Sequence, residues 1–396
     1  MTCRKKRRKN SKTRPPGCCP IFRVSILATL GSSAETAVAS CADVAVVILN
    51  WNGQELLRQF LPSVLANSDG ARIVVADNAS TDASVAVLQK EFPSVHIIQN
   101  SSNLGFCEGY NQALQQVAEP YYVLLNSDVA VTPGWLRPLR SLLEERPEVA
   151  ACQPKIRAFH DPERFEYAGA GGGYLDRLGY PFCRGRLFDT LEIDRGQYDD
   201  ARPVAWATGA CMMVRASAWH AQGGLEKAFF AHMEEIDLCW RLQNAGLEVW
   251  YHGGSTVYHV GGGTLHKSNP RKTYLNYRNG LALVYKNTAE AELLGTMISR
   301  VILDWVAALR SLLQGAAAEA GAILRAHRDF YNQLTYWKLQ RKASLHKLRT
   351  AERQGVFNGS LVWAYFAQGK RTFGELQIPD RTALTAHGAA HVHPER

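Results

Sequence analysis

Three short apolar runs of the chain end in Asn or Asp, residue types that bind cations and polar ligands. They are Val44–Leu49 before Asn50-Trp51-Asn52-Gly53, Ile73–Ala76 before Asp77, and Tyr121–Leu125 before Asn126-Ser127-Asp128. In an open α/β sheet, ligands bind in the crevice beyond the carboxyl ends of the strands. A lone aspartate at such a place can hold a divalent cation against a diphosphate. Asp128 is therefore the first candidate metal ligand.

The segments between these runs have the periods of strands and helices in alternation. Apolar residues of 55–65 recur at spacings of three and four, and helical patterns follow again after Asp82 and after Asn103. Residues 95–98 form a further short apolar run. This βαβαβ order predicts an α/β fold with a mostly parallel sheet and right-handed crossovers. The first turn lacks the G-x-G-x-x-G pattern and the chain lacks a P-loop, so we expect a metal to bind phosphate.

The positive charge of the chain is concentrated near its ends. Of the formal +9, residues 1–14 carry +8 and residues 325–353 carry +6, which leaves the remainder acidic at −5. Basic ends are attracted to anionic lipid or nucleic acid, and the charge alone does not choose between them. The N-terminal run also has the composition of a solvated, disordered tail.

Targeting signals and disulfides are not expected. Residues 21–30 are the only candidate for the apolar core of a signal peptide, and Arg23 and Ser25 interrupt them. No stretch reaches the roughly 20 apolar residues that cross a bilayer. The nine cysteines form no Cys-x-x-Cys pair, which fits reduced thiols in a cytosolic protein.

Seven sequence blocks, in this order, resemble the family 2 glycosyltransferases of the GT-A fold, and most closely their bacterial rhamnosyltransferase branch. The blocks lie at residues 46–52, 77–82, 103–106, 124–128, 209–215, 229–241 and 258–263. The resemblance covers residues 44–285. It implies a GT-A type sheet flanked by helices, followed here by a C-terminal amphipathic helical extension.

For the nucleotide, the resemblance implies that Asp77 accepts a hydrogen bond from the imide N–H of a uracil or thymine base. Trp51 has a flat face suited to covering that base, although core filling would explain a tryptophan equally well. We expect Asp82 to cap the following helix. The remaining candidates for nucleotide contact are Leu49, Asn50, Asn52, Gly105, Asn111 and Asn126.

For the metal, the resemblance implies that Asp128 coordinates Mg²⁺ or Mn²⁺ across the two phosphates of the donor. The family often has Asp where this chain has Asn126, which supplies no charge. His259 resembles the family's late metal-binding histidine and must be neutral to ligate. A lone histidine is more often structural; His252 and His266 are weaker candidates. The glycines at 261–263 suit either a lid or a loop close to substrate.

For the chemistry, inverting transfer needs a base that takes a proton from the acceptor hydroxyl. Glu235 stands where the family usually has a shorter aspartate, so Glu234 is a competitor for this role. Asp237 is a third catalytic candidate, although we expect it to cap the helix or to hold Arg241. Acids in the first turn of a helix are also favoured by the helix dipole alone. Residues 223–227 depart from the family pattern on the acceptor side.

Two regions outside the blocks are harder to interpret. Residues 154–203 hold the sugar and acceptor loops in this family, but no pattern assigns individual residues there. Residues 294–313 predict an amphipathic helix. With the basic segment after it, this helix suits an anionic membrane surface, packing on the catalytic domain, or a dimer interface. We therefore divide the chain into a tail (1–42), a catalytic domain (43–287, with halves 43–150 and 151–287), a helical region (288–355) and a C-terminal tail (356–396).

The expected function is metal-dependent, inverting sugar transfer. The donor is dTDP-rhamnose or a UDP-sugar, and the acceptor a cell-surface polysaccharide or a polyprenyl-diphosphate-linked glycan. Such an acceptor places the enzyme in the cytoplasm, peripheral on the inner face of the plasma membrane, as a monomer or oligomer. A sugar-phosphate nucleotidyltransferase is the enzymatic alternative, but its glycine-rich, basic loop is missing after Leu49. A nucleic-acid-binding protein is disfavoured by the acidic body.

Overall fold

The structure is a computed structural model that describes residues 40–261, 269–349 and 353–378. The basic N-terminal run, the candidate signal segment, His266, Gly262 and Gly263 lie outside the described residues.

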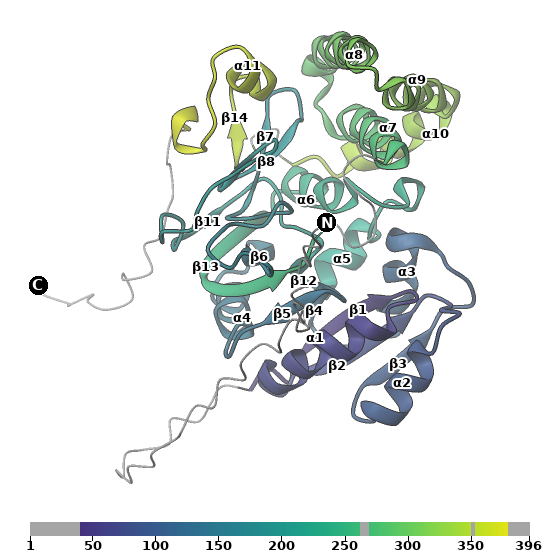
Figure 1. Cartoon of the computed structure of the whole chain (residues 1–396), viewed down its shortest axis with the longest axis vertical. Helices are drawn as coiled ribbons and strands as arrows, with labels where there is room; N and C mark the ends of the chain where they lie inside the picture. Colours follow the sequence, from purple (N-terminus) through teal and green to yellow (C-terminus); the bar gives the residue numbers. More distant parts are fainter. Residues whose placement is uncertain (1–39, 262–268, 350–352, 379–396) are drawn as a thin grey trace, which may run out of the picture. The chain divides into compact units, whose positions relative to one another are not determined.

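A nine-stranded mixed sheet organises the catalytic part of the chain (Figure 1). Its order is β11-β13-β6-β12-β4-β1-β2-β3, with β5 paired to β13. The strands are β1 (Val44–Asn50), β2 (Arg72–Asp77), β3 (His96–Gln99), β4 (Tyr121–Asn126), β5 (Val129–Val131), β6 (Val149–Ala158), β11 (Ala201–Pro203), β12 (Cys211–Arg215) and β13 (Glu248–His259). Pairing is parallel through β3-β2-β1-β4 and between β6 and β13, and antiparallel at β12, β11 and β5.

The predicted N-terminal α/β half is confirmed. β1 is apolar at nearly every position because both of its faces are covered, as is usual for a parallel strand. Helices α1 (Gln54–Asn67) and α4 (Leu136–Glu145) bury their apolar sides with one face of the sheet. Helices α3 (Gly105–Leu114), α5 (Ala216–Gln222) and α6 (Glu234–Asn244) bury theirs with the other. Helix α2 (Ser84–Glu91) joins β2 to β3.

The register of the parallel strands brings the predicted polar residues to one edge. Asn50 pairs with Asp77 across β1 and β2, and Leu49 pairs with Asn126 across β1 and β4. The three polar strand ends recognised in the sequence are therefore neighbours.

The segment at 154–203 builds part of a second, five-stranded sheet of order β10-β9-β8-β7-β14. Its strands are β7 (Gly173–Asp176), β8 (Pro181–Cys183), β9 (Arg186–Leu187), β10 (Thr190–Leu191) and β14 (Val356–Phe357). Because β14 pairs with β7, residues 356–378, which we expected to be tail, fold against this sheet. They also form helix α11 (Leu361–Phe366) and the short turn η2 (Gly374–Leu376).

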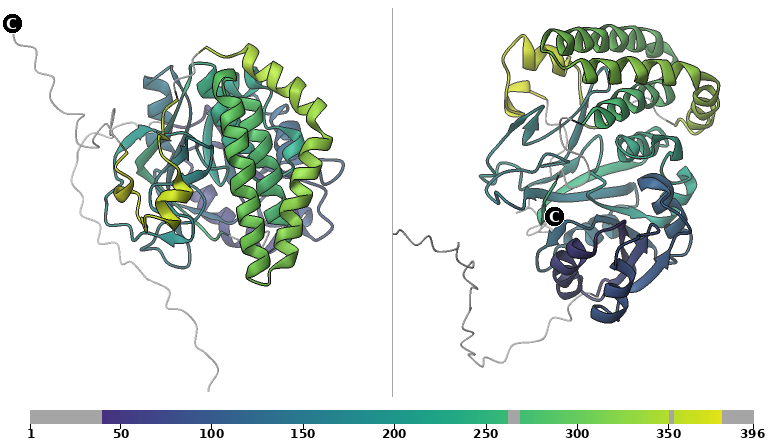
Figure 2. Two further views of the ribbon diagram at one scale, coloured as in Figure 1. Left: turned by 90° about the horizontal axis from the view of Figure 1, so that it is seen from above. Right: turned by 45° about the vertical axis from the view of Figure 1, so that its right-hand side comes forward.

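Four further helices form a layer beyond α6 (Figure 2). They are α7 (Pro270–Asn287), α8 (Glu290–Leu313), α9 (Ala317–Asn332) and α10 (Leu334–His346). Helix α7 packs on α6, and α8, α9 and α10 pack on α7. Among the described residues, no helix combines the length and apolar content required to cross a membrane.

Candidate active site

The ends of β1 and β2 hold a buried carboxylate in a fixed position. Asp77 is almost fully buried; its Oδ1 accepts a hydrogen bond from Asn50 Nδ2 at 3.1 Å, and its Oδ2 accepts one from the Ser80 backbone N–H at 2.9 Å. The Asn50 side-chain oxygen is buried and has no hydrogen-bond partner among the described residues. A donor such as a base imide could approach this polar strand end.

Trp51 and Asn52 lie in the turn that follows β1. Trp51 is 53% exposed, so the core-filling interpretation of this tryptophan is wrong and its ring face is open to a ligand. Asn52 has φ +52°, and its side-chain oxygen accepts the backbone N–H of Thr81 at 2.7 Å. Asn52 thus joins the turn after β1 to the loop after β2.

Asp82 was predicted to cap the following helix; the N-cap residue of α2 is Ala83, and Asp82 bonds the helix start from one residue earlier. Its carboxylate accepts the backbone N–H of Ser84, the first residue of α2, at 3.0 Å. The other carboxylate oxygen accepts the Gln54 backbone N–H at the start of α1 at 3.1 Å. Asp82 therefore satisfies unpaired amides at two helix starts.

A network of asparagine side chains, which the sequence analysis missed, holds the loop before α3. Asn78 donates to Asn103 Oδ1 and to the Gly105 carbonyl, both at 3.0 Å, and accepts from Asn100 Nδ2 at 3.1 Å. Gly105 has φ +74°, and a Cβ there would lie 2.6 Å from the Phe230 ring. Glycine is required at this position because the loop before α6 approaches it so closely.

Asn111 has surroundings different from those of the other nucleotide candidates. Its amide group donates to the Leu225 carbonyl at 2.9 Å and accepts the Leu225 backbone N–H at 2.8 Å. It also borders a pocket of about 420 Å³ between α5, α7 and α10 that includes no other predicted site residue. These contacts give Asn111 a structural role.

The metal candidates Asp128 and His259 meet because β5 pairs with the end of β13. His259 is opposite Val129 in this ladder, and the Val260 backbone N–H donates to the Asp128 carbonyl at 3.1 Å. His259 Nε2 lies 3.1 Å from Asp128 Oδ1 and 3.3 Å from Asn126 Nδ2. His252, by contrast, lies within β13 opposite Ala201.

Glu166 is a further member of this group that sequence reasoning missed. Its Oε2 lies 3.3 Å from His259 Nδ1, at an angle that leaves this ring nitrogen without a well-formed hydrogen bond. Burial alone would lower the pKa of His259, but the Asp128 and Glu166 carboxylates raise this pKa to about 10. Without a cation the imidazole is therefore protonated at neutral pH and held between two acids, and a cation would have to displace the Nε2 proton to bind there.

The geometry of Asp128 and His259 fits a shared divalent cation. Two ligand atoms bound to one Mg²⁺ at about 2.1 Å lie about 3 Å apart, which matches their separation. A carboxylate on the other ring nitrogen, as Glu166 provides, is the usual support of a metal-bound histidine. Within residues 40–261, 269–349 and 353–378, no three His, Cys, Asp or Glu side chains form a complete metal cage. The two residues would thus need further ligands from donor or water.

Glu234 and Glu235 begin helix α6, next to the turn that enters β12. A Cβ on Gly209 would lie 3.8 Å from the Glu235 Cβ, and the Ala210 carbonyl accepts the Asn126 backbone N–H at 3.0 Å. Each glutamate has one buried carboxylate oxygen without a hydrogen-bond partner in the described part of the chain. Glu234 is buried, whereas Glu235 remains partly exposed.

Burial shifts the protonation of both glutamates. It raises the pKa of Glu235 to about 7, although the backbone N–H groups of Ile236 and Gly209 oppose this change. Burial and the nearby charge of Glu235 raise the pKa of Glu234 well above its usual value. Of the two, Glu234 retains its proton more strongly, so Glu235 is the carboxylate that ionises near neutral pH.

The loop before α6 has an unusual backbone that α7 holds in place. Phe230, His232 and Met233 all have positive φ, a conformation that costs free energy in residues other than glycine. Asn279 on α7 donates its side-chain amide to the carbonyls of Phe229, Ala231 and His232 at 2.8–3.1 Å. Sequence periodicity gave no signal for this clamp.

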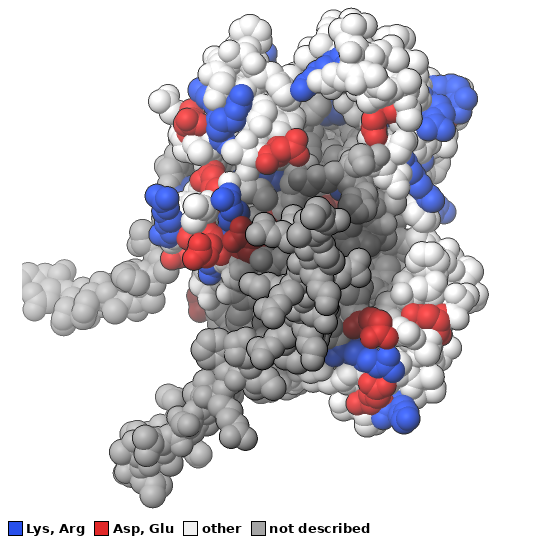
Figure 3. All heavy atoms as spheres, in the orientation of Figure 1, with Lys and Arg blue, Asp and Glu red and all other residues white. Residues whose placement is uncertain are grey.

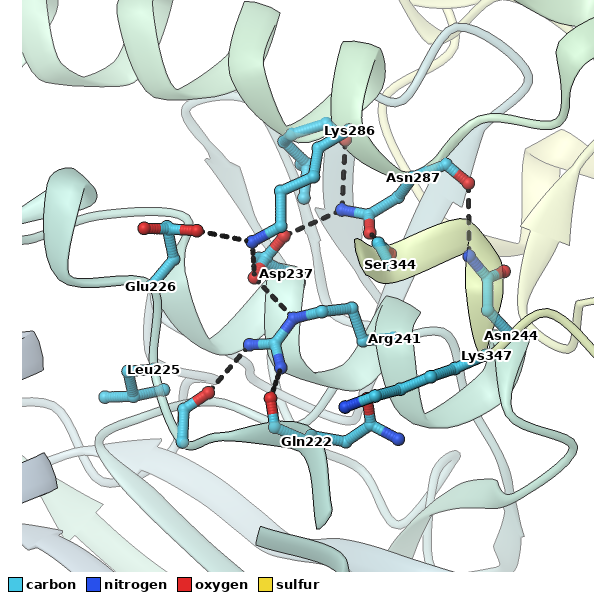
Figure 4. Close-up of polar contacts among 12 residues, drawn as sticks. Gln222, Leu225, Glu226, Asp237, Arg241, Asn244, Lys286, Asn287, Ser344 and Lys347 are labelled. Carbon is cyan, nitrogen blue, oxygen red and sulfur yellow. Dashed lines mark hydrogen bonds and ion pairs between the residues drawn. The ribbon is translucent and has the colours of Figure 1, made fainter. Parts of the chain in front are cut away.

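Asp237 lies within a network of charged and polar side chains (Figure 4). Its carboxylate accepts hydrogen bonds from Arg241 Nε at 2.8 Å, Lys286 Nζ at 2.9 Å and Asn287 Nδ2 at 2.7 Å. Burial alone would raise the pKa of Asp237, but Lys286 and Arg241 lower this pKa to about 2. The expected contact with Arg241 is therefore present, and the side chain is fully buried.

Comparison with known proteins relates the chain to sugar-transferring enzymes. The family model described as Glycosyl transferase family 2 matches residues 45–217. N-acetylglucosaminyl-diphospho-decaprenol L-rhamnosyltransferase of Mycobacterium tuberculosis is 29% identical over 234 residues, which is 54% of this chain and 75% of the relative. Rhamnosyltransferase WbbL of Escherichia coli is 23% identical over 219 residues, 52% of this chain and 80% of the relative.

Solved structures with similar backbones include GalNAc-T7 with UDP, GalNAc and Mn²⁺. It has a TM-score of 0.48 and 14% identity, and the match covers 64% of this chain and 48% of that one. Staphylococcus aureus TarS 1–349 with UDP-GlcNAc has a TM-score of 0.46 and 13% identity, over 76% of this chain and 89% of that one.

Proposed function

Since the chain is a family 2 glycosyltransferase similar to rhamnosyltransferases, we propose that it uses dTDP-rhamnose or a UDP-sugar as donor and inverts the anomeric centre. The proposed acceptor is a cell-surface polysaccharide or a polyprenyl-diphosphate-linked glycan. The rhamnosyltransferase of M. tuberculosis, whose name includes a diphospho-decaprenol acceptor, supports this choice. The family match supports sugar transfer over the nucleotidyltransferase and nucleic-acid-binding alternatives.

The observation that carries the proposal is the continuity between the acidic start of α6 and the end of β4. Glu235 lies beside Gly209, the next residue Ala210 is hydrogen-bonded to Asn126, and Asn126 contacts His259. One short stretch of backbone thus connects a candidate base to the candidate cation ligands. Such an arrangement suits attack by an acceptor on a donor whose diphosphate lies at the strand ends.

In this proposal, Asp77 and Trp51 bind the nucleotide base. The buried Asp77 carboxylate is fixed by Asn50 and Ser80, and the exposed Trp51 ring lies in the adjoining turn. Asn50, Asn52 and Leu49 shape this end of the site. Gly105 has no side chain, so the loop before α6 can pack close to it. We leave Asn111 outside the nucleotide-binding set because Leu225 occupies its amide.

Asp128 and His259 would hold Mg²⁺ or Mn²⁺, with Asn126 beside them and Glu166 orienting the imidazole. When bound, the cation would neutralise charge on the donor diphosphate as the nucleotide leaves. Among the described residues, Asp128 supplies the only carboxylate at the Nε2 side of His259. The donor phosphates therefore complete the site in our proposal.

Glu235 is the proposed general base, and Asp237 a positioning residue. A base is most effective when its pKa lies near the working pH, and the pKa of Glu235 is about 7. Glu235 is also the more exposed of the two glutamates, so an acceptor hydroxyl can reach it. Asp237 is enclosed by Arg241, Lys286 and Asn287 and holds α6 against α7.

The test combines a donor panel with two matched variants. Release of dTDP or UDP is measured from a set of nucleotide sugars, with Mn²⁺ or with EDTA, in the presence of lipid-linked acceptors. Glu235→Gln is expected to lower kcat by about 10²-fold or more while nucleotide binding is retained. Glu234→Gln, one residue away, is the control and should keep most of the turnover. Full activity of Glu235→Gln would overturn the base assignment, and no release from any donor would overturn the proposed reaction.

A lipid-linked acceptor would require the enzyme to work at a membrane. We therefore propose a peripheral location on the inner face of the plasma membrane, where such acceptors would be presented.

A further inference from the structure

Helix α8 has its apolar side outside and its polar side inside. Its buried residues are Arg300, Asp304 and Ala308. Its exposed large apolar residues are Leu294, Ile298, Ile302, Trp305, Val306, Leu309, Leu312 and Leu313, each more than half exposed. At about 100° per residue, these eight fall within an arc of about 120°, opposite the three buried residues. The periodicity predicted from the sequence is present, but the apolar stripe does not face the protein.

Buried polar contacts fix this orientation. Asp304 accepts hydrogen bonds from the Tyr180 hydroxyl at 3.2 Å and lies 3.1 Å from His327 Nε2 on α9. Arg300 donates to the Leu178 carbonyl at 3.3 Å, and its guanidinium stacks 3.9 Å from the centre of the Tyr180 ring. Turning the apolar stripe inward would break these buried contacts of Arg300 and Asp304. The outward stripe is therefore a stable feature of the fold.

The apolar stripe continues from α8 onto α11. A groove of about 700 Å³ is lined by Ile302 and Leu303 of α8 and by Trp363 and Phe366 of α11. Trp363 is 64% exposed, and the Arg310 guanidinium lies 4.9 Å from the centre of the Phe366 ring. From here on, the term apolar stripe includes Trp363 and Phe366 of α11 as well as the eight exposed apolar residues of α8. A tryptophan and an arginine at its margin are typical of helices in the headgroup region of a bilayer.

The charge around the apolar stripe favours an anionic partner. Residues 290–349 contain nine Lys or Arg and five Asp or Glu, a net charge of +4; residues 334–349, on and after α10, carry +5, and residues 290–333 carry −1. Exposed cations include Arg310 at the end of α8 and Arg325 and Arg328 on α9. In Figure 3 the visible surface over α8 and α9 is mostly white, with blue side chains toward its sides and a red group below. An apolar stripe with exposed arginines near its C-terminal end and a basic helix α10 in the same layer matches the layered chemistry of acyl chains beneath anionic headgroups.

We propose that the apolar stripe docks on the surface of an anionic lipid bilayer, with α8 lying in the plane of the interface. A helix of 24 residues is about 36 Å long, so the stripe offers a continuous line of insertion along most of α8. A second copy of the chain is a poorer occupant, because a symmetric interface would have to bury the exposed arginines beside the stripe without a partner chosen for them. The inference rests on these exposed side chains and not on the proposed sugar transfer.

The test measures binding of the full chain to vesicles by flotation at 0.15 M salt. Vesicles of phosphatidylcholine mixed with phosphatidylglycerol are compared with vesicles of phosphatidylcholine alone. The wild type is expected to float with the anionic vesicles and much less with the neutral ones. The variant with Ile298→Gln, Ile302→Gln and Leu309→Gln should lose about tenfold or more of this binding. These side chains are exposed and glutamine favours helices, so the fold should be kept.

The control carries Ile193→Gln and Leu339→Gln, two exposed apolar residues outside the apolar stripe, and should bind like the wild type. Because all variants keep the basic N-terminal run, that segment cannot account for a difference between them. Equal flotation of the triple variant and the wild type would overturn the proposal. The proposal would also be overturned if the wild type did not bind vesicles but sedimented as a dimer, and the triple variant abolished that dimer. The stripe would then be an interface with a second copy of the chain. Hydrolysis of the donor, in which water takes the sugar and the nucleotide is released, is measured in parallel without acceptor lipid, so failure of catalysis is distinguished from failure of docking.

Discussion

At the scale of single residues, the two adjacent glutamates at the start of α6 differ in what their environments allow. Glu234 is buried and its pKa is raised well above the usual value, whereas Glu235 is partly exposed with a pKa of about 7. Both carboxylates have an oxygen without a partner among the described residues. A hydroxyl group is the kind of donor that would satisfy such an oxygen.

The pKa of Glu235 predicts how activity depends on pH. A general base acts only when it is deprotonated, so kcat/KM should rise with pH up to about 7 and level off above that value. The measurement is kcat/KM between pH 5.5 and 8.5. In Glu234→Gln the inflection should stay within about half a unit, because Glu234 is already neutral over this range. An inflection that moves by more than a unit in this variant would assign the ionisation to Glu234.

Some residues of the site could be recognised from sequence and others could not. Asp77, Trp51, Asp128 and the two glutamates follow strands or open a helix, where local pattern is informative. Glu166 follows no such pattern, because its contact is with His259, far along the chain. The asparagine network around Asn78 is equally invisible, since its members act only after the loops have folded together.

At the scale of elements, sequence pattern predicted β1 to β4 and the helices between them. The apolar runs of β1, β2 and β4 are buried on both faces, β3 lies at the sheet edge with one buried residue, and the helices have a clear period. The strands β7 to β10 have two to four residues each, too few for a period of two to be recognised. The period of α8 was readable, but its orientation was not. That orientation depends on the buried partners of Arg300 and Asp304 on other elements.

The junction of α6 and α7 should depend strongly on Asp237. Asp237→Asn removes the buried negative charge that pairs with Lys286 and Arg241. The free energy of unfolding should therefore fall by about 3–5 kcal/mol. The measurement is urea unfolding at pH 7. Asp161→Asn removes an acid from an exposed ion pair with Arg164 and should cost less than about 1 kcal/mol.

The pH dependence of this junction has a definite sign. The pKa of Asp237 is lowered to about 2 in the folded protein, against 3.8 for an ordinary aspartate. Its contribution to stability is therefore complete above about pH 4 and is lost as the pH falls toward 2. Equal unfolding free energies for the wild type and Asp237→Asn at pH 7 would show that α7 holds α6 by other contacts.

At the scale of the whole molecule, the proposed function requires that nucleotide and metal bind together to the folded chain. Residues from β1, β2, β4 and β13 contribute to the proposed site, so occupancy favours the folded state over the unfolded one. Docking through the apolar stripe would leave this site free to act, since it uses α8 and α11 instead.

Thermal unfolding with ligands tests this requirement without turnover. A nucleoside diphosphate at about 100 times its Kd stabilises a protein by about 2.7 kcal/mol, which raises Tm by several degrees. We expect this rise for UDP or dTDP with Mn²⁺. With EDTA the rise should be much smaller, because in our proposal the diphosphate is held through the cation, and Asp128 is the only carboxylate on the Nε2 side of His259 among the described residues.

Glu166→Gln should raise the Mn²⁺ concentration needed for half of the effect by about 10–100-fold, since His259 loses its orienting acid. Glu163→Gln, an exposed acid three residues earlier, should leave it unchanged. The same Tm rise in EDTA and in Mn²⁺ would show that the nucleotide binds without the cation, and the proposed metal site would then be wrong.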